Sequence, residues 1–379
     1  MVNKYLQLIY LILYKIKRKL KFGKFIEHFF VEILFFSFLF FKNFKKYKST
    51  KPTILICRSK YMKDKNVESQ SRIFLFDTLI KFNVDVFEFY CDLESKRMGY
   101  LNKLIKKIIY IDPDIILFNE YSDNIINGFY HPSQNVLKKL KPYVKSKFLI
   151  LWYDTCSDSF FYKNLKPKFD IFDFHVIVEN PEKKLIGIKE HEFKKLLFLY
   201  PIPNPNELYK IDVPKNIDVS FLGQIDSYRE YRKIFIEKLN KEKLSNSDLD
   251  IYISTNQKAN FLTHIEYANI LNRSKISINF SKSVHFDQLK GRIWEILLSG
   301  SLLLETKNTQ TDTLLVDGKE YVSFTNEENM INKIRYYLMN DVEREKIALN
   351  GYNKARKIFE KQNFWENIFI SSGKKITKI

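Results

Sequence analysis

The sequence predicts an α/β protein built from two Rossmann-like units in tandem, preceded by a basic, apolar helical segment. Short apolar runs alternate with helical stretches from residue 53 onward, the same alternation starts again at residue 218, and a proline-rich run separates the two series. Such alternation is typical of a parallel sheet with crossover helices. The chain of 379 residues is long enough to bury two cores, so we expect two domains.

The first 50 residues differ in composition from the rest of the chain. Residues 1–51 hold twelve Lys or Arg and two acids, and so carry +10 of the formal net charge of +19. Two apolar runs, residues 5–14 and 29–41, are too short for the roughly 18 apolar residues of a membrane-spanning helix. No signal-peptide cleavage site follows the first run. We therefore expect residues 1–50 to lie in the interface of an anionic membrane, with a core-packing helical hairpin as the alternative.

The first unit is expected over residues 51–203. Its predicted strands are residues 53–57, 84–90, 114–119, 148–153 and 174–178, and its first predicted helix is residues 72–81. Asn83 follows this helix where a left-handed residue commonly ends a helix, and asparagine tolerates that conformation. The first strand is not followed by a GxGxxG sequence, which argues against a nicotinamide-binding unit.

The second unit is expected over residues 204–360, with a helix and a basic tail over residues 361–379. The run YPIPNP at residues 200–205 separates the units, because its three prolines disfavour regular structure. The predicted strands of the second unit are residues 218–222, 250–254, 276–279 and 301–304, and its predicted helices include residues 230–239 and 289–298. Ser299 and Gly300 are expected to stop the second of these helices.

Residues 287–305, DQLKGRIWEILLSGSLLLE, combine acidic and basic side chains with a loop, a helix, a turn and a strand. Asp287 is expected at the amino end of the helix, and Lys290, Arg292 and Glu295 follow within two turns. Backbone amides, the positive end of the helix dipole and cationic side chains could then act together on a bound diphosphate. A surface ion pair is the alternative for Arg292 and Glu295, but the apolar residues around them favour a buried helix.

Four motifs of the second unit carry a resemblance to a known family. They are DVSFLGQ at residues 218–224, NRSKISINFS at residues 272–281, LKGRIWEILLSG at residues 289–300 and GKEYVSF at residues 318–324, and residues 333–359 follow as a pair of helices. This half of the chain resembles the glycosyltransferase group 1 class, and most closely its CgeB-like branch. The resemblance implies a GT-B fold, in which two Rossmann-like domains face a cleft and the last helix crosses back to the first domain.

The resemblance also implies roles for two acids. Seven residues separate Asp287 from Glu295, which is the spacing of the paired acids in many retaining enzymes of this class. Glu295 would accept hydrogen bonds from the donor ribose, and Asp287 would contact the transferred sugar. Neither role requires a metal or a cofactor. The usual first acid is Glu, so the shorter Asp287 leaves its reach to the sugar open.

Transfer of a sugar leaves negative charge on the departing diphosphate, so cations and amide donors are needed near it. The candidate donor-binding residues are Gly223, Arg229, Arg232, Lys275, Asn279, His285, Lys290 and Glu295, and Arg292 completes the cationic set. By resemblance, Gly223 keeps a loop close to the phosphates, and Arg229 or Arg232 approaches them. The alternative for both arginines is a solvated helix face.

The acceptor is expected on the first unit. The predicted strand ends there supply Asn119, Glu120, Asp154 and Asp158. Asp154 follows a buried strand and could act as the general base of an inverting enzyme, although an Asx turn is at least as good an interpretation. A retaining enzyme needs no such base, and the spacing of the two acids favours retention.

Several other functional classes receive little support. The Asp-x-Asp sequences at residues 112–114 and 248–250 precede predicted strands and are interpreted as turns rather than metal sites. Cys57, Cys91 and Cys156 are odd in number and lack a CxxC spacing, which argues against disulfides or zinc and favours a reducing cytoplasm. Beyond the N-terminal segment the basic residues are spread thinly, which argues against nucleic-acid binding.

The sequence thus predicts a cytoplasmic glycosyltransferase, peripheral on the inner face of the cell membrane. It would move a sugar from a nucleotide-sugar donor to a surface-glycan or lipid-linked acceptor in polysaccharide biosynthesis, and the acceptor class follows mainly from the expected membrane segment. A catalytically inactive GT-B scaffold or binding protein is the alternative, which the presence of Asp287 in place of Glu permits.

Overall fold

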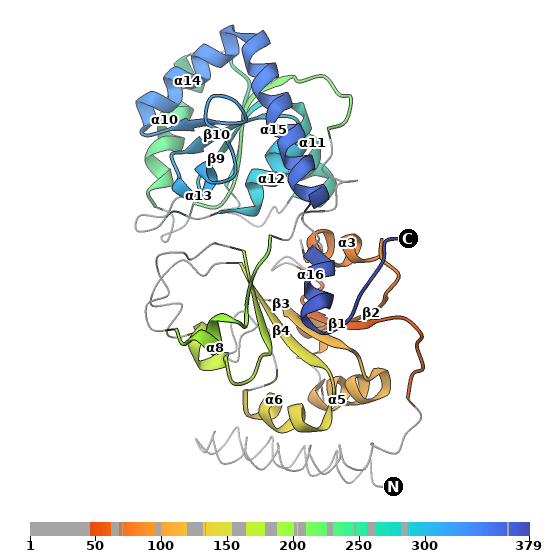
Figure 1. Cartoon of the computed structure of the whole chain (residues 1–379). Helices are drawn as coiled ribbons and strands as arrows, with labels where there is room; N and C mark the ends of the chain where they lie inside the picture. The colour runs from red at the N-terminus through yellow and green to blue at the C-terminus, as the bar shows by residue number, and fades with distance from the viewer. Residues whose placement is uncertain are drawn as a thin grey trace.

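The chain folds into two α/β units, each built on a parallel sheet. The computed structural model describes residues 46–61, 68–69, 71–94, 100–119, 132, 134–153, 164–178, 188–200, 203, 210–225, 230–245, 248–255, 262–281, 287, 289–361 and 364–379. Within these residues the second unit lies above the first in Figure 1. The expected membrane-associating segment, residues 1–50, lies almost entirely outside the described part of the chain.

The first unit contains a six-stranded sheet in the order β2-β1-β3-β4-β5-β6. Its strands are β1 (Thr53–Arg58), β2 (Asp85–Tyr90), β3 (Ile115–Asn119), β4 (Lys147–Trp152), β5 (Phe174–Ile177) and β6 (Leu196–Phe198). Its helices are η1 (Arg72–Phe76), α3 (Asp77–Leu79), α4 (Cys91–Glu94), α5 (Tyr100–Ile111), α6 (Gln134–Leu140), η2 (Lys141–Tyr143), η4 (Lys166–Lys168) and α8 (Glu190–Phe193). The five expected strands are confirmed to within one residue at each end, and the three-residue β6 was missed.

The end of the helix expected over residues 72–81 differs from the prediction. The segment is a π-helical turn, η1, followed by the single turn of α3, which ends at Leu79. Asn83 is not left-handed. Instead, its amide donates a hydrogen bond to the carbonyl of Thr377 at 2.8 Å, so the C-terminal tail fixes this turn. Among the described residues the non-glycine residue with a positive φ is Asp112, at 49°, immediately after α5.

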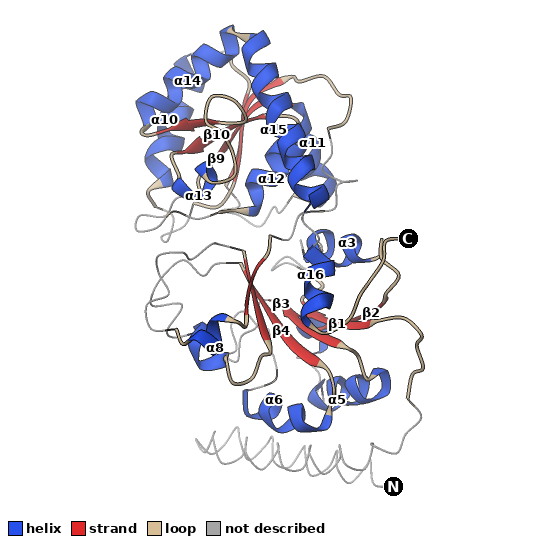
Figure 2. Cartoon of the chain, in the orientation of Figure 1, coloured by secondary structure: helices blue, strands red, loops and turns tan. Residues whose placement is uncertain are grey.

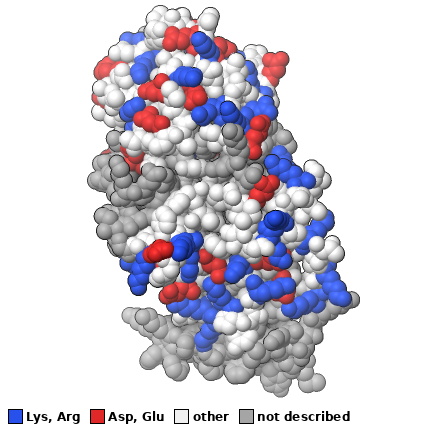
Figure 3. Space-filling view, viewed as in Figure 1, with Lys and Arg blue, Asp and Glu red and all other residues white. Residues whose placement is uncertain are grey.

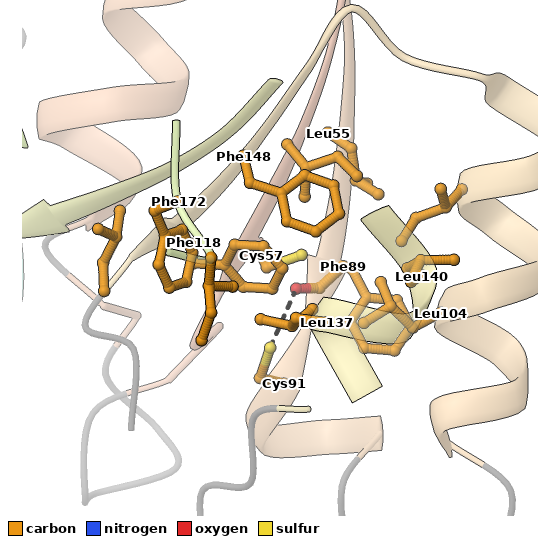
Figure 4. Packing of buried hydrophobic residues seen from close by; sticks show 14 of the residues in the cluster. Leu55, Cys57, Phe89, Cys91, Leu104, Phe118, Leu137, Leu140, Phe148 and Phe172 are labelled. Atoms are coloured by element: carbon orange, nitrogen blue, oxygen red, sulfur yellow. Dashed lines mark hydrogen bonds between the residues drawn. The ribbon is translucent and has the colours of Figure 1, made fainter. Parts of the chain in front are cut away.

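One face of the first sheet packs into a core of aromatic and aliphatic side chains. Figure 4 shows the rings of Phe118 and Phe172 close to Cys57, and these two rings are 5.7 Å apart in an edge-to-face arrangement. Cys57 and Cys91 are free and buried in this core. Their thiols therefore serve as small apolar groups. Cys156 lies outside the described residues.

The other face of the first sheet is covered by α16 (Phe364–Ser371), which follows the second unit in sequence. Figure 2 shows this helix in the lower unit, beside α3. Trp365 is buried and donates from Nε1 to Oγ1 of Thr78 at 2.9 Å, while Ile368 and Phe369 enter the core. The chain thus returns to the first unit, as the family resemblance implied.

The second unit contains a five-stranded sheet in the order β11-β10-β9-β7-β8. Its strands are β7 (Ile217–Leu222), β8 (Ile251–Ser254), β9 (Ser274–Asn279), β10 (Leu302–Thr306) and β11 (Val322–Phe324). Its helices are α10 (Arg232–Ser245), α11 (His264–Arg273), α12 (Gly291–Leu298), α13 (Thr309–Asp312), α14 (Glu327–Met339) and α15 (Asp341–Lys361). In both sheets the order reverses beside the first strand, between β1 and β3 and between β7 and β9. Ligands of such sheets bind outside the carboxyl ends of the strands at this reversal.

α12 is a mostly buried helix, as the apolar residues of its sequence predicted. Ile293 to Leu298 are all buried, and Gly300 ends the segment in a left-handed conformation with a φ of 67°. α15 crosses it closely. A Cβ on Gly351 of α15 would lie 2.3 Å from the carbonyl oxygen of Glu320 and 2.7 Å from Cδ2 of Leu297. Only a glycine allows this approach.

The apolar length of the helices and the distribution of surface charge bear on the surroundings of the molecule. Among the described residues, no helix combines the length and the apolar character that crossing a membrane requires. On the face seen in Figure 3, Lys and Arg side chains are interspersed with Asp and Glu over both units.

Gly351→Ala is expected to destabilise the protein, because the added methyl group has to displace the backbone at Glu320. We expect the free energy of unfolding in urea to fall by about 1–3 kcal/mol or more. The exposed Lys346 on the same helix provides the control, since Lys346→Ala is expected to change it by less than about 0.5 kcal/mol. Equal unfolding free energies for the two variants would contradict the close packing of α15.

Candidate active site

The amino end of α12 lies where the second unit meets the first. A Cβ on Gly291, the first residue of α12, would lie 3.6 Å from the ring of Phe74 in η1. The ring of Tyr200, which follows β6, lies 6.3 Å from that of Trp294. Figure 1 shows α12 and α13 on the side of the second unit that faces the first. The amino end of α12 is therefore placed at the junction.

α12 begins later than the sequence predicted. The helix starts at Gly291 rather than at residue 289, and Lys290 is its N-cap residue with an extended backbone. Asp287 consequently lies further before the helix than predicted. No acidic side chain occupies that turn, so the positive end of the helix dipole is not neutralised from within the helix.

Glu295, Arg292 and Tyr267 form a hydrogen-bonded group. The Tyr267 hydroxyl, from α11, donates to Oε2 of Glu295 at 2.6 Å. Nε of Arg292 donates to the same hydroxyl at 3.2 Å. Arg292 and Glu295 are three residues apart on α12 and therefore share one side of the helix. Glu295 is only 5% exposed, so its carboxylate depends on these partners.

The electrostatics of this group follow from burial. Burial raises the pKa of Glu295 above its usual range, while the positive charge of Arg292 and the hydrogen bond from Tyr267 act to lower it. Burial, together with the nearby charge of Glu295, strongly raises the pKa of the Tyr267 hydroxyl. Tyr267 therefore keeps its proton and remains a hydrogen-bond donor at physiological pH.

Gly223 leaves room for the guanidinium of Arg292. A Cβ at this position, immediately after β7, would lie 2.9 Å from Nη1 of Arg292 and 2.8 Å from Cζ of Phe221. The absence of a side chain thus brings the loop after β7 against Arg292 at the reversal of strand order. Arg292, Glu295 and Gly223 are the predicted residues that the structure brings together most closely.

The sequence suggested either the donor phosphates or solvent as the surroundings of Arg232, and the structure shows different ones. Its side chain is buried, and its guanidinium donates to the carbonyl of Phe280 at 2.8 Å and to that of Gln224 at 3.2 Å. It therefore ties the segments after β9 and β7 together. The alternative of a solvated helix face is wrong for Arg232, and these donors are directed at backbone carbonyls.

Asp287 is held against α13. Its Oδ2 accepts hydrogen bonds from the backbone amide of Thr309 at 2.9 Å and from the Thr309 hydroxyl at 2.6 Å. Thr309 is the first residue of α13, which follows β10. α13, rather than α12, thus holds Asp287 at the carboxyl edge of the second sheet.

Asn279, the last residue of β9, is fully buried beneath this edge. Its Nδ2 donates to Oγ of Ser281 at 2.9 Å and to Oε1 of Glu305 at 3.2 Å. Glu305 is fully buried on β10, and burial raises its pKa to about 8. Asn279 is therefore directed at another side chain of the protein.

Lys275 lies at the opposite edge of the sheet. It is the second residue of β9, and its ammonium group pairs at 2.7 Å with Asp218, the second residue of β7. Because the strands are parallel, their first residues lie at the edge remote from the carboxyl ends. The prediction that Lys275 binds the donor is therefore corrected.

The remaining candidates are distributed as follows. Arg229, His285, Glu120, Asp154 and Asp158 lie outside the described residues. In the first unit, Arg58 at the end of β1 is buried and bound by Glu88 and Glu68. Asn119 at the end of β3 is also buried, and its Oδ1 accepts no hydrogen bond from a described residue. The described residues include no group of three or more His, Cys, Asp and Glu side chains that could hold a metal ion.

Sequence reasoning missed three residues of the site. Tyr267 and Thr309 make the hydrogen bonds to Glu295 and Asp287, but nothing in their local sequence distinguishes them from other helical Tyr and Thr residues. Glu305 could have been found, because an acid that ends the apolar run LLLE of a buried strand is unusual.

Tyr267→Phe is expected to destabilise the protein at neutral pH by about 1–3 kcal/mol, because the buried Glu295 loses a hydrogen-bond donor. Since that hydrogen bond lowers the pKa of Glu295, the substitution should raise it further. The loss of stability should therefore be largest where Glu295 is ionised and should shrink as the pH falls. Urea unfolding from pH 4 to pH 8 measures this difference. Tyr252→Phe, a partly buried tyrosine beside the same hydrophobic cluster, is the control, and an equal, pH-independent loss in both variants would contradict the assignment.

One family model matches part of the chain. Residues 229–369 match the family model described as "Glycosyl transferase-like", and this span contains Asp287, Arg292 and Glu295. No match was found among curated protein sequences.

The fold is similar to that of several solved structures. The crystal structure of Anabaena HepE in complex with UDP and glucose has a TM-score of 0.56 at 10% identity and covers 84% of this chain and 99% of that chain. A glycosyltransferase from Rickettsia africae has a TM-score of 0.55 at 14% identity and covers 86% of this chain and 99% of that chain. Sucrose-phosphate synthase from Thermosynechococcus elongatus has a TM-score of 0.54 at 10% identity, with 85% and 98% covered. The chain therefore has the GT-B fold, and its second unit is similar to the glycosyl transferase-like family.

Proposed function

We propose that this protein is a glycosyltransferase that moves a sugar from a nucleotide-sugar donor to an acceptor. The observation that carries the proposal is the hydrogen-bonded group formed by the buried Glu295 with the partly buried Arg292 and Tyr267. This group lies beside Gly223 at the reversal of strand order, and α12 with its two charged residues falls within the span that matches the glycosyl transferase-like family. In sheets of this order the reversal is where ligands bind.

The donor would bind with its diphosphate at the amino end of α12. The first backbone N–H groups of a helix have no partner within it, and the first turn of α12 carries no acid. Lys290 and Arg292 add positive charge to these donors. By the family resemblance, Glu295 would accept hydrogen bonds from the ribose. The HepE structure contains UDP and glucose, which supports a uridine diphosphate sugar as the donor.

Transfer breaks the bond between the anomeric carbon and the diphosphate oxygen, and it forms a bond between that carbon and an acceptor oxygen. The nucleoside diphosphate leaves with the electron pair, and Arg292, Lys290 and the helix amides stabilise its developing charge. The leaving phosphate takes the proton of the acceptor hydroxyl, so the anomeric configuration is retained without a metal. The spacing of Asp287 and Glu295 supports retention. Proton NMR of the product tests it, since an inverted anomer would instead require a base such as Asp154.

The acceptor would bind on the first unit. Asn119 lies at the carboxyl end of β3, at the reversal of strand order in the first sheet, and its buried Oδ1 is unpaired among the described residues. A sugar hydroxyl is a donor of the kind that this oxygen needs. We propose a surface-glycan or lipid-linked acceptor, which agrees with the basic, apolar residues 1–45.

We also propose that residues 1–45 hold the protein at the inner face of the cell membrane. The Tyr47 hydroxyl donates to Asp85 at 2.9 Å, and Lys46 pairs with Asp112 at 2.7 Å. Asp85 begins β2 and Asp112 precedes β3, so the described chain begins at the edge of the first sheet opposite its carboxyl ends. A membrane bound on that side leaves the candidate site accessible to a soluble donor.

The wild-type protein is expected to gain thermal stability from one class among uridine, guanosine and cytidine diphosphate sugars, because a ligand that binds the folded state stabilises it. Glu295→Gln should bind that donor at least about tenfold more weakly and turn it over about 100-fold more slowly. Glu320→Gln, at a buried carboxylate outside the site, is the control for loss of charge. If the wild type and Glu295→Gln hydrolyse the donor at the same background rate, the result would instead indicate an inactive scaffold.

Deletion of residues 1–45, which keeps the contacts of Lys46 and Tyr47, is expected to abolish sedimentation with phosphatidylglycerol vesicles. Each Lys or Arg near an anionic surface contributes about 1 kcal/mol of binding. A full-length variant with Gln at residues 15, 17, 18 and 19 should therefore bind these vesicles more weakly and phosphatidylcholine vesicles unchanged. Undiminished sedimentation of the truncated protein would refute the anchor.

A further inference from the structure

The carboxyl end of β10 carries a buried acid that no described Lys or Arg neutralises. Glu305 is fully buried, and it accepts hydrogen bonds from Nδ2 of Asn279 at 3.2 Å and from Oγ1 of Thr311 at 3.3 Å. The Ser281 hydroxyl is its third hydrogen-bond partner. Among the residues that the structure describes, no Lys or Arg pairs with Glu305. A buried carboxyl group of this kind is costly, so its position calls for an explanation.

Glu305 joins three segments at the candidate site. Asn279 is its register partner on β9, Ser281 begins the loop that leads toward α12, and Thr311 belongs to α13. The first residue of α13, Thr309, gives both of its hydrogen bonds to Asp287. A continuous connection therefore runs from Glu305 through α13 to the carboxylate of Asp287.

We propose that Glu305 is a positioning residue of the donor site, which holds α13 and the loop after β9 and thereby fixes the carboxylate of Asp287. This inference rests on the proposed function in one respect, namely that Asp287 faces the donor sugar. The connection from Glu305 to Asp287 is independent of what the protein binds.

The protonation state of Glu305 determines how its carboxyl group holds α13 and the loop after β9. Burial raises the pKa of Glu305 from 4.5 to about 8, the hydrogen bonds from Ser281, Thr311 and Asn279 lower it, and the charge of Asp312 raises it. Asp312, on α13, itself accepts from Tyr321 and pairs with Lys307, which also lies near Asp317. At neutral pH the carboxyl group therefore keeps its proton. Ionisation above pH 8 would place an unpaired charge under α13.

The sign of the pH effect follows from this raised pKa. Folded Glu305 retains a proton that the unfolded chain releases above about pH 4.5, so Glu305 makes the free energy of unfolding fall as the pH rises toward 8. Glu305→Gln is neutral at every pH and similar in shape. In this variant up to one fewer proton should be released on unfolding between pH 5 and pH 8, so the free energy of unfolding should depend less on pH. The position of α13 should be preserved.

Hydrogen exchange at pH 7 tests the connection without any ligand. The amide of Thr309 is protected by its hydrogen bond to Asp287. In Glu305→Ala this amide should exchange about tenfold faster, and in Glu305→Gln it should exchange at nearly the wild-type rate. Ser301→Ala removes a buried hydroxyl just before β10, at the opposite end of the strand, and should leave the amide unchanged. Equal exchange in Glu305→Ala and Ser301→Ala would overturn the proposal.

Donor turnover tests whether Glu305 positions Asp287 at the donor site. With the nucleotide sugar that stabilises the wild type, kcat should fall above about pH 8, and in Glu305→Gln it should stay level through pH 9. In Glu305→Ala kcat should fall about tenfold or more, while KM for the donor changes less, because Asp287 rather than the diphosphate site is displaced. A wild-type pH profile in Glu305→Gln would overturn the role of Glu305 at the site. If no nucleotide sugar binds the wild type, the proposed function fails, and the exchange experiment still decides the connection.

Discussion

The buried carboxylate of Glu295 is the constraint on which the rest of the candidate site depends. A carboxylate with so little exposure has to receive hydrogen bonds and a positive charge, or else it stays protonated. Tyr267 supplies the hydrogen bond, and Arg292 supplies the charge. Gly223, which carries no side chain, leaves room for the guanidinium of Arg292. A single buried charge thus fixes α11, α12 and the loop after β7 relative to one another.

The second unit contains a second buried acid whose surroundings are opposite in character. Burial raises the pKa of both Glu295 and Glu305. The guanidinium of Arg292 favours the charged form of Glu295, whereas the charge of Asp312 favours the neutral form of Glu305. Two acids in one domain thus have surroundings of different charge, and such differences are how enzymes assign different roles to the same residue type.

The sheets could be predicted from the sequence, but the contacts of the site could not. Strands in both units form short apolar runs between polar segments, and this pattern is local. The first residue of α12, Gly291, lies against Phe74, which is more than two hundred residues earlier in the chain. Lys275 resembled a ligand-binding residue because it belongs to a family-like motif, although the register of β9 places it beside Asp218 at the wrong edge. Hydrogen bonds such as those from Tyr267 and Thr309 join elements that only the folded chain brings together.

A short segment of the first unit, η1 and α3, contacts the second unit in addition to the contact of Tyr200 with Trp294 and the chain itself. η1 and α3 lie between α12 and α16: Phe74 of η1 faces Gly291, and Thr78 of α3 accepts the hydrogen bond of Trp365. The chain passes from the first unit to the second after residue 200 and returns before α16, so this segment contacts the second unit and the returning helix at once. Five of its residues are π-helical, a geometry that is rare and frequently found at functional sites. η1 thus lies against both the returning helix region and the end of α12 where the donor diphosphate is proposed to bind.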